Sequence, residues 1–394
     1  MTDQEPTEPL SKDPGTLKKL AMIIVTIFIM LILLEISLQL ILRIRDGKWL
    51  YQSLEGSRVS YVKLVKDKRV YTLMPGFKFK SKNGGLIINE LGFREGPYPI
   101  DKKNFIIVTA GDSVPFGLAV GNRNTYPYNL EKFLHKNGYS INVVNTGIPS
   151  YNMRQSFERI RLEVLPHYEL SRIPVITLQV SNDVFLLILY REKWNPDVTY
   201  ADRRYIKKVS LWQKFAVIHY GTLAIKKIFG TKTHKKRHRR KAWDFSSAGK
   251  KRKVFEKYDG TEMLENARAI FRKELSFYRD HSVKVVLMSI DPFYYQLSGV
   301  EKNPGLKQWP IFKEWAEAVS ELVIQYNHML IEISREFDNA FFFDTRPLVD
   351  ARDRDEMYVD FMHYSAKANE IVAKGLYDFL TQQRLLPESE YHQD

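Results

Sequence analysis

The residues that could do chemistry in this 394-residue chain begin with Gly111-Asp112-Ser113. They follow the run 105–109, which has the composition of a short buried strand. The glycine lets the backbone turn sharply, and a serine that starts the next helix is placed at the edge of the sheet. Its hydroxyl can then act as a nucleophile while its own N–H helps to bind an oxyanion. Ser113 is therefore a candidate nucleophile for acyl transfer.

Two further clusters follow predicted strands and carry hydrogen-bond donors. Gly147 comes just after the run 141–144, and Asn182 comes just after the run 173–180. The N–H of a glycine and the side-chain amide of an asparagine are suitable donors to the oxyanion of a tetrahedral intermediate. Each also has a purely structural interpretation, since Gly147 suits a plain turn and Asn182 suits a helix N-cap. Both interpretations remain open from these residues alone.

An Asp-x-x-His pair near the C-terminal end supplies a candidate base, His363, and a carboxylate that can orient its imidazole, Asp360. Asp360 and His363 are about one helical turn apart, so the carboxylate can hold one imidazole nitrogen while the other faces a serine. The chain has nine histidines, and the other eight lack this setting. No Gly-x-Ser-x-Gly elbow surrounds Ser113, which disfavours the α/β-hydrolase fold.

The elements that must position these clusters alternate between short apolar runs and longer helical stretches. Strands are predicted at 105–109, 141–144, 173–180, 283–290 and 340–343, and helices at 126–136, 153–165, 261–281, 309–337 and 366–382. This alternation predicts a parallel sheet covered by helices on both faces. Sites in such sheets form beyond the carboxyl ends of the strands, which is where the clusters fall.

The N-terminal part predicts a membrane anchor. A polar tail, residues 1–19, precedes the apolar run 20–42, which would span roughly 34 Å as a helix against a hydrocarbon core of ~30 Å. The run is longer than the core of a signal peptide and is followed by charged residues, which favours an uncleaved transmembrane helix. Glu35 within it is expected to reach the interface or to pair with a neighbouring helix. Basic residues balance on the two sides, so they do not fix the orientation.

The net charge of +14 is concentrated in one segment. Residues 226–253 hold 13 Lys and Arg against one acid, Asp244, and so carry +12. They belong to a predicted insertion at about 184–260. Two interpretations of the basic segment remain open: it binds anionic lipid or glycan, or it forms a solvated loop. Nucleic acid is not an expected partner, because no recognition motif is present. The chain contains no cysteine, which excludes disulfides, thiolate metal sites and cysteine nucleophiles.

Taken together, the four clusters resemble those of the SGNH (GDSL-type) hydrolase superfamily, in its membrane-anchored bacterial form. The resemblance implies a three-layer, flavodoxin-like α/β fold with a central parallel sheet, here preceded by one transmembrane helix. It implies that Ser113 is the nucleophile and that Asp360 and His363 complete the triad. The oxyanion hole is then formed by Ser113, Gly147 and Asn182.

Two positions depart from the pattern of that superfamily. Val180 stands where the third block usually has a glycine, and Ala368 lies near the place of a glycine that usually follows the catalytic histidine. Neither change removes a catalytic atom, but Val180 would narrow the site or shift Asn182. The stretch 89–94 also resembles a segment of membrane-anchored members, and a structural role is expected for it.

The resemblance implies the following organisation and function. A linker region, residues 43–84, joins the transmembrane helix to a hydrolase-like domain at 85–385. The expected activity is hydrolysis of O-acyl or O-acetyl esters on a carbohydrate or envelope polysaccharide, with no metal or other cofactor. The alternatives are an O-acyltransferase in polysaccharide modification, or a degenerate scaffold that binds anionic lipid or glycan. The expected location is the cytoplasmic (inner) membrane, single-pass, with the domain on the periplasmic or extracellular side.

Overall fold

The computed structural model describes most of the chain outside the predicted insertion. The described residues are 14–46, 49, 56–57, 60–80, 84–101, 103–184, 206–207, 214–228, 261–292, 309–350 and 352–388. Of the basic segment 226–253, residues 229–253 lie outside them. The chain divides into two compact units, one formed by residues 1–58 with 206–238 and the other by residues 59–205 with 239–394.

The second unit is built on a five-stranded parallel sheet. Its strands are β6 (Phe105–Gly111), β7 (Ile141–Asn145), β8 (Val175–Gln179), β10 (Lys284–Met288) and β11 (Ala340–Phe343). They lie in the order β11-β10-β8-β6-β7, and every neighbouring pair is parallel. This is the flavodoxin-like order, whose switch point falls between the first strand, β6, and the third, β8. The α/β fold expected from the sequence is confirmed.

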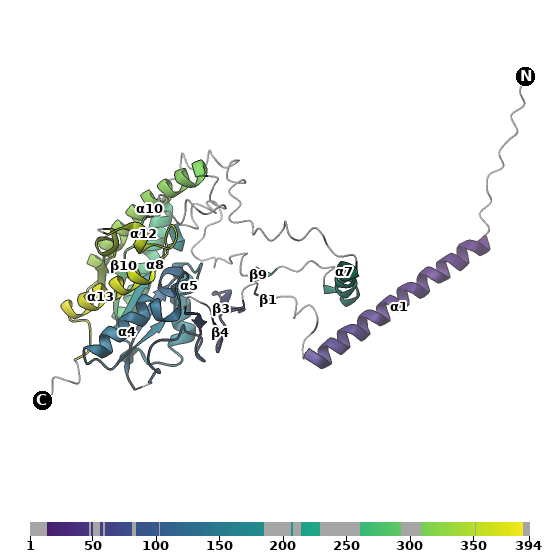
Figure 1. Ribbon diagram of the computed structural model, residues 1–394, viewed down its shortest axis with the longest axis horizontal. Coiled ribbons are helices and arrows are strands. Elements are labelled where there is room, and N and C mark those ends of the chain that lie inside the picture. The colour runs from purple at the N-terminus through teal and green to yellow at the C-terminus, as the bar shows by residue number, and fades with distance from the viewer. Residues whose placement is uncertain are drawn as a thin grey trace, which may run out of the picture. The chain divides into compact units, whose positions relative to one another are not determined.

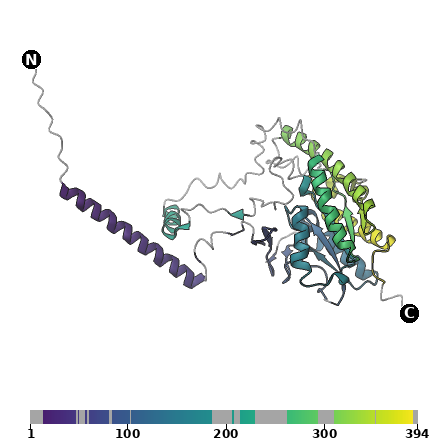
Figure 2. The ribbon, with the colours of Figure 1, turned by 180° about the vertical axis from the view of Figure 1, so that it is seen from behind.

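Helices cover both faces of this sheet (Figure 1). On one face α4 (Tyr126–Lys136) packs against α13 (Ala366–Gln382). The other carries α5 (Met153–Arg159), α8 (Thr261–Arg279) and α10 (Trp309–Glu336), which lie in front of the strands when the molecule is seen from behind (Figure 2). Because both faces are covered, the strands are apolar and nearly all their residues are buried.

Local sequence sets where these helices begin. Thr125 caps α4 by accepting the N–H of Tyr128, and Ser365 caps α13 by accepting the N–H of Ala368. Asn152 and Gln155 form a reciprocal capping box at the start of α5. The helix predicted at 153–165 is α-helical only to Arg159 and continues as a π-helical turn, Ile160–Val164.

The residues before the sheet form small antiparallel pairs rather than a bare connection. β2 (Val62–Leu64) pairs with β3 (Tyr71–Leu73), and β4 (Lys78–Phe79) pairs with β5 (Leu86–Ile87). Tyr71 donates a hydrogen bond to the carbonyl oxygen of Pro149 at 3.0 Å, and the hydroxyl of Tyr151 donates to the carbonyl oxygen of Tyr71. The region 60–80, which the sequence assigned to a linker, therefore packs on the loop that follows β7.

The first unit contains α1 (Pro14–Asp46), α7 (Ala216–Ile228) and the short pair of β1 (Gly56–Ser57) with β9 (Ile206–Lys207). Within α1 the 28 residues Lys18–Arg45 are long and apolar enough to cross a membrane, and none of their most apolar window is buried. Glu35 accepts hydrogen bonds from the N–H groups of Ala216 and Val217, at 2.8 and 2.9 Å. Its partner is thus the start of a second helix.

Candidate active site

The candidate nucleophile lies at the end of β6, beside the switch point of the sheet. Ser113 is the first residue of the short helix α3 (Ser113–Phe116), and Asp112 is its N-cap. Gly111 has a φ of 143°, and a Cβ at this position would overlap the carbonyl oxygen of Gln179. Only glycine allows the chain to leave β6 this close to β8. The turn thus presents Ser113 at the carboxyl edge of the sheet.

Ser113, His363 and Asp360 form one hydrogen-bonded chain. The Nε2 of His363 lies 2.8 Å from the hydroxyl of Ser113, and its Nδ1 lies 2.7 Å from Asp360 Oδ2. Ser113 and His363 are only 5% and 8% exposed. When Nδ1–H donates to the carboxylate, Nε2 is left to accept the hydroxyl proton of Ser113. The arrangement can remove that proton as the oxygen attacks an electrophile.

The carboxylate of Asp360 is held by more than the imidazole. Its Oδ1 accepts the backbone N–H groups of Met362 and His363, at 3.0 and 2.9 Å. Burial alone would raise the pKa of Asp360, but His363 and these N–H groups outweigh it, and the pKa lies below its ordinary value. Asp360 therefore stays ionised at neutral pH, as a group that orients an imidazole must.

The proposed oxyanion donors lie around α3 but differ in what they contact. The N–H of Ser113 has no acceptor among the described residues. The side-chain amide of Asn182 donates to the carbonyl oxygen of Tyr151 at 3.1 Å, which leaves its second N–H. The N–H of Gly147 donates to Asn145 Oδ1 at 3.0 Å. Among the described residues the Ser113 N–H and the second N–H of Asn182 have no acceptor, whereas the N–H of Gly147 is engaged.

Gly147 is also fixed by close packing against α3. A Cβ at this position would overlap the backbone nitrogen of Phe116 and lie 3.0 Å from the carbonyl oxygen of Asp112. Asn145, which holds the Gly147 N–H, also donates to the carbonyl oxygen of Pro115 at 2.8 Å. We call residues 111–116 the nucleophile turn. The loop after β7 cannot move away from this turn without breaking these contacts.

Asp112 ties the nucleophile turn to the loop after β8. Its Oδ2 accepts the N–H and the hydroxyl of Ser181, at 2.6 and 2.7 Å, and the N–H of Asn182 at 3.0 Å. Its Oδ1 accepts the N–H of Val114 at 3.0 Å. Burial raises the pKa of Asp112 above its ordinary value despite these four donors. The residue joins the positions of Ser113 and Asn182, a role that the sequence analysis missed.

The buried side chain of Arg159 holds the loop that contains Gly147. Arg159 has no exposed surface, and it donates to the carbonyl oxygens of Thr146 at 2.9 Å and Gly92 at 2.6 Å. Its charge is balanced by Glu163, 2.7 Å away. Burial would raise the pKa of Glu163, but Arg159 and its other partners lower it below its ordinary value. The sequence offered one signal for this ion pair, because Arg159 and Glu163 are four residues apart in a predicted helix that packs on the core.

The stretch 89–94 also braces the site. Arg94 is buried and donates to the carbonyl oxygens of Phe116, Gly117 and Val120, the last two at 2.7 and 2.6 Å. Burial lowers the pKa of Arg94 to about 9. Its guanidinium thus binds carbonyl oxygens at the C-terminal end of α3, whereas Asp112 caps the N-terminal end of that helix.

The two departures from the superfamily pattern are absorbed by the core. Val180 is 3% exposed, and Ala368 is fully buried in α13. The N–H of Asn182 still reaches Asp112, so valine at position 180 leaves the loop attached to the nucleophile turn. Beside the triad a small cavity of about 10 Å³ is lined by Val114, Gln179, Ser181, Ile290, Asp291 and Met362.

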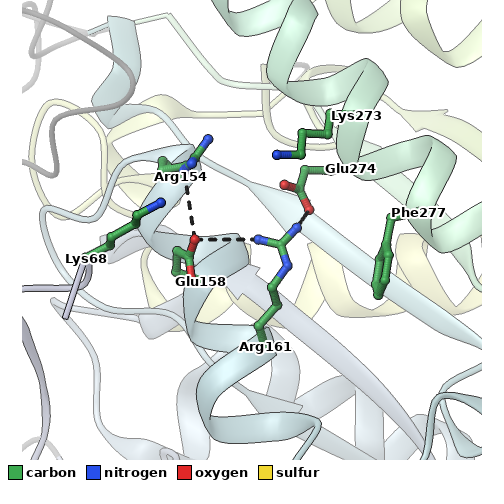
Figure 3. Close-up of a pocket in the computed structure, with 7 residues that line it drawn as sticks. All are labelled: Lys68, Arg154, Glu158, Arg161, Lys273, Glu274 and Phe277. Carbon is green, nitrogen blue, oxygen red and sulfur yellow. Dashed lines mark hydrogen bonds and ion pairs between the residues drawn. The ribbon is translucent and has the colours of Figure 1, made fainter.

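A larger cavity of about 360 Å³ lies outside this site (Figure 3). Its lining is mostly charged and consists of Lys68, Arg154, Glu158, Arg161, Lys273, Glu274 and Phe277. Arg161 forms an ion pair with Glu274 of α8 and lies 3.8 Å from Glu158 of α5. These contacts join the two helices on that face of the sheet, and no triad residue reaches the cavity. Among the described residues there is no group of three or more potential metal ligands.

The fold and the site define an α/β protein of flavodoxin-like strand order with a Ser–His–Asp chain at its switch point. Similar solved structures include the acetylxylan esterase Axe2 from Geobacillus stearothermophilus, at 17% identity and a TM-score of 0.38, covering 73% of this chain and 98% of that one. A GDSL-like lipase from Parabacteroides merdae gives 14% and 0.38, with coverage of 74% and 100%. No family model matches the sequence, and no curated protein matches it significantly.

Proposed function

We propose that this chain is a serine esterase that cleaves O-acyl esters through Ser113, His363 and Asp360. The observation that carries the proposal is the continuous hydrogen-bonded chain from the Ser113 hydroxyl through both imidazole nitrogens to a carboxylate that stays ionised. Serine is a weak nucleophile unless a base is placed against it. A base that is itself oriented by an acid has no evident structural purpose at a nearly buried serine.

The reaction proceeds in two steps. The Ser113 oxygen attacks the ester carbonyl while His363 Nε2 takes its proton, and Asp360 stabilises the resulting imidazolium. The tetrahedral intermediate then expels the alcohol, which receives that proton from His363, and an acyl group remains on Ser113. Water attacks this acyl-enzyme with His363 again as base, and the acid is released as Ser113 recovers its proton.

The oxyanion is held by the Ser113 N–H and the Asn182 amide, with Gly147 as the third donor. Among the described residues the Ser113 N–H and one N–H of the Asn182 amide have no acceptor, and the N–H of Gly147 would be shared between Asn145 and the oxyanion. Removal of one such donor typically lowers turnover by about 10²–10³-fold. Asp112, Asn145 and Arg159 hold the donors in register without touching the ester.

A small acyl group on a carbohydrate is the proposed substrate. The small cavity lined by Val114 and Met362, the neighbours of Ser113 and His363 in the chain, has room for about one water-sized group. We therefore propose acetyl in preference to a long acyl chain. We place the site outside the cytoplasmic membrane, held there by α1, where envelope polysaccharides carry O-acyl groups. The acyl-enzyme would serve a transferase equally well if a sugar hydroxyl replaced water in the second step, so the acceptor is an outcome to be measured.

Acetate release from an acetylated polysaccharide tests this function directly. Wild type and Ser113→Ala should be compared on acetylated xylan and on a small aryl acetate, with the exposed Ser171→Ala as the matched control. The proposal predicts acetate release by wild type and by Ser171→Ala and none by Ser113→Ala. Acetyl transfer to an added sugar without free acetate would instead identify an acyltransferase. No Ser113-dependent turnover of either substrate would favour the scaffold.

A further inference from the structure

Helix α7 lies in the first unit and begins against the transmembrane segment. Ala216, its first residue, packs in a small apolar cluster with Leu38 and Leu42 of α1. The side chain of Gln39 donates to the carbonyl oxygen of Lys214 at 3.0 Å, just before α7 begins. Figure 1 shows α7 end-on while α1 is seen from the side, so the two helices cross steeply.

Glu35 is the residue that joins the two helices. Its two carboxylate oxygens accept the N–H groups of Ala216 and Val217, and Oε1 also accepts the side chain of Gln39 at 2.7 Å. The first N–H groups of a helix have no partner within it, and a negative charge there is favoured by the helix dipole. A carboxylate within a membrane-spanning helix is costly unless it is paired. The Glu35 carboxylate of α1 thus gives the first N–H groups of α7 an acceptor, and these N–H groups give the carboxylate its partners.

The level of α7 along α1 follows from these contacts. Leu42 is the last residue of the apolar run 20–42, and Arg43 beyond it lies over the ring of Trp49 at 5.8 Å, a pair typical of the membrane–water interface. Glu35 is eight residues before Arg43, about 12 Å along a helix. The start of α7 is therefore held between the interface and a depth of about 12 Å, on the side of the span that leads to the hydrolase-like unit.

Helix α7 exposes apolar side chains, as a helix at the membrane interface would. Ile218 and Leu223 are 37% and 47% exposed, and Tyr220 is exposed as well. At 100° per residue, Val217, Ile218 and Gly221 lie on one side of the helix, and Leu223 lies beside His219 on the other side. An interfacial helix buries its apolar face about 5–10 Å into the boundary between head groups and acyl chains. Ile218, the exposed apolar residue of the first side, is at that depth if α1 spans the membrane.

We propose that α7 is an interfacial helix that lies in the plane of the membrane, docked on the transmembrane helix by Glu35 and covered on its apolar face by lipid. The chain is then attached to the bilayer by two elements that are far apart in the sequence. Because residues 206–238 belong to the same compact unit as the anchor, the segment after β8 returns to the membrane before the sheet is completed.

The absence of cysteine allows single labels to test the depth of α7. Full-length protein with Ile218→Cys, Leu223→Cys or Ile324→Cys, the last an exposed apolar control in α10, carries a fluorescent label in vesicles of phosphatidylcholine and phosphatidylglycerol. Quenching by spin-labelled lipid should be several-fold stronger at Ile218 than at Ile324, with Leu223 between them, and iodide should show the reverse order. Equal iodide quenching at Ile218 and Ile324 contradicts the proposal, and so does an Ile218 label shielded from both quenchers.

Disulfide trapping tests the role of Glu35 separately. The pair Leu42→Cys with Ala216→Cys should cross-link readily, and the pair Ile24→Cys with Ala216→Cys should not. Glu35→Leu, which removes both acceptors, should lower the cross-linked fraction about tenfold at short times, and Glu35→Gln should lower it less. Alkaline extraction shows whether each variant still integrates into the membrane. An unchanged cross-linking rate in membrane-integrated Glu35→Leu would remove Glu35 as the dock.

Discussion

Asp112 Oδ2 accepts the backbone N–H of Asn182 at 3.0 Å, so the residue that precedes the proposed nucleophile holds the residue proposed to bind the oxyanion. The two belong to loops after β6 and β8, on either side of the switch point. Their contact converts two separate strand ends into one rigid site. It also identifies Asp112 as a positioning residue, since it accepts four hydrogen bonds and contacts no ester atom in the proposed mechanism.

The first prediction concerns this contact. Asp112→Asn replaces one acceptor oxygen by an amide that faces the Ser181 and Asn182 donors, so Asn182 should shift. We expect kcat on an aryl acetate to fall about 10²–10³-fold, the effect of a lost oxyanion donor, while KM changes little. Steady-state kinetics measures this, with the exposed Asp280→Asn as the matched control. A kcat within threefold of wild type would show that the contact is dispensable.

Gly147 provides a prediction that rests on packing alone. Gly147→Ala would place a methyl group on the backbone of Phe116, so the nucleophile turn must move. We expect a loss of at least tenfold in kcat, measured on protein shown to be folded by circular dichroism. Gly221→Ala in α7 is the control, because no atom lies within 4 Å of a Cβ there and alanine favours a helix. Equal activity of Gly147→Ala and wild type would mean that the turn is not held as described.

The buried Arg159 should matter for stability as well as for activity. Arg159→Lys keeps the charge but cannot reach the carbonyl oxygens of Thr146 and Gly92 and also Glu163. We expect the free energy of unfolding in urea to fall by about 1–3 kcal/mol, the usual cost of leaving a buried hydrogen-bonding group without its partner. Arg172→Lys, at an exposed site, should change it by less than about 0.5 kcal/mol. Similar values for the two variants would contradict the assigned role.

Glu131 makes the stability depend on pH. Burial raises the pKa of Glu131 to about 8, and its side chain accepts a hydrogen bond from Asn142 at 2.7 Å. The folded protein therefore binds one more proton than the unfolded chain between pH ~4.5 and about 8, and its stability falls as pH rises through this window. The slope from this group is at most about 1.4 kcal/mol per pH unit.

Glu131→Gln should flatten that dependence. The amide keeps an oxygen for Asn142 and cannot ionise, so the difference in unfolding free energy between variant and wild type should grow in favour of the variant from pH 5 to 8. Chemical denaturation at several pH values measures it. Asp183, whose pKa burial raises to about 7, adds a similar trend to both proteins and cancels in the difference. Parallel curves would show that Glu131 does not titrate in this range.

Much of the fold could be predicted because its signals are local. The strands before Ser113, Gly147 and Asn182 are short apolar runs, and the helices at 126–136 and 366–382 have the bounds expected from their caps and periodicity. The alternation of these elements is sufficient to predict a parallel sheet, and its geometry then brings the four clusters to one edge.

The features that sequence reasoning missed depend on residues distant in the chain. Asp112 meets Ser181 about 70 positions later, and Tyr71 meets Pro149 about 80 positions later, so neither contact leaves a periodic pattern. Asn145 holds the N–H of Gly147, a detail of side-chain orientation that composition does not encode. The partner of Glu35 lies in a segment that was interpreted as part of an insertion.

The measurement that tests the central claim most directly is covalent labelling by a fluorophosphonate, followed by identification of the modified residue by mass spectrometry. Wild-type protein should carry a single adduct on Ser113, with the rate of labelling about 10³-fold lower in His363→Ala, because Nε2 can no longer accept the proton. Ser113→Ala should not be labelled. An adduct on another serine, or a folded wild-type protein that resists labelling, would contradict the assignment of Ser113 as the nucleophile.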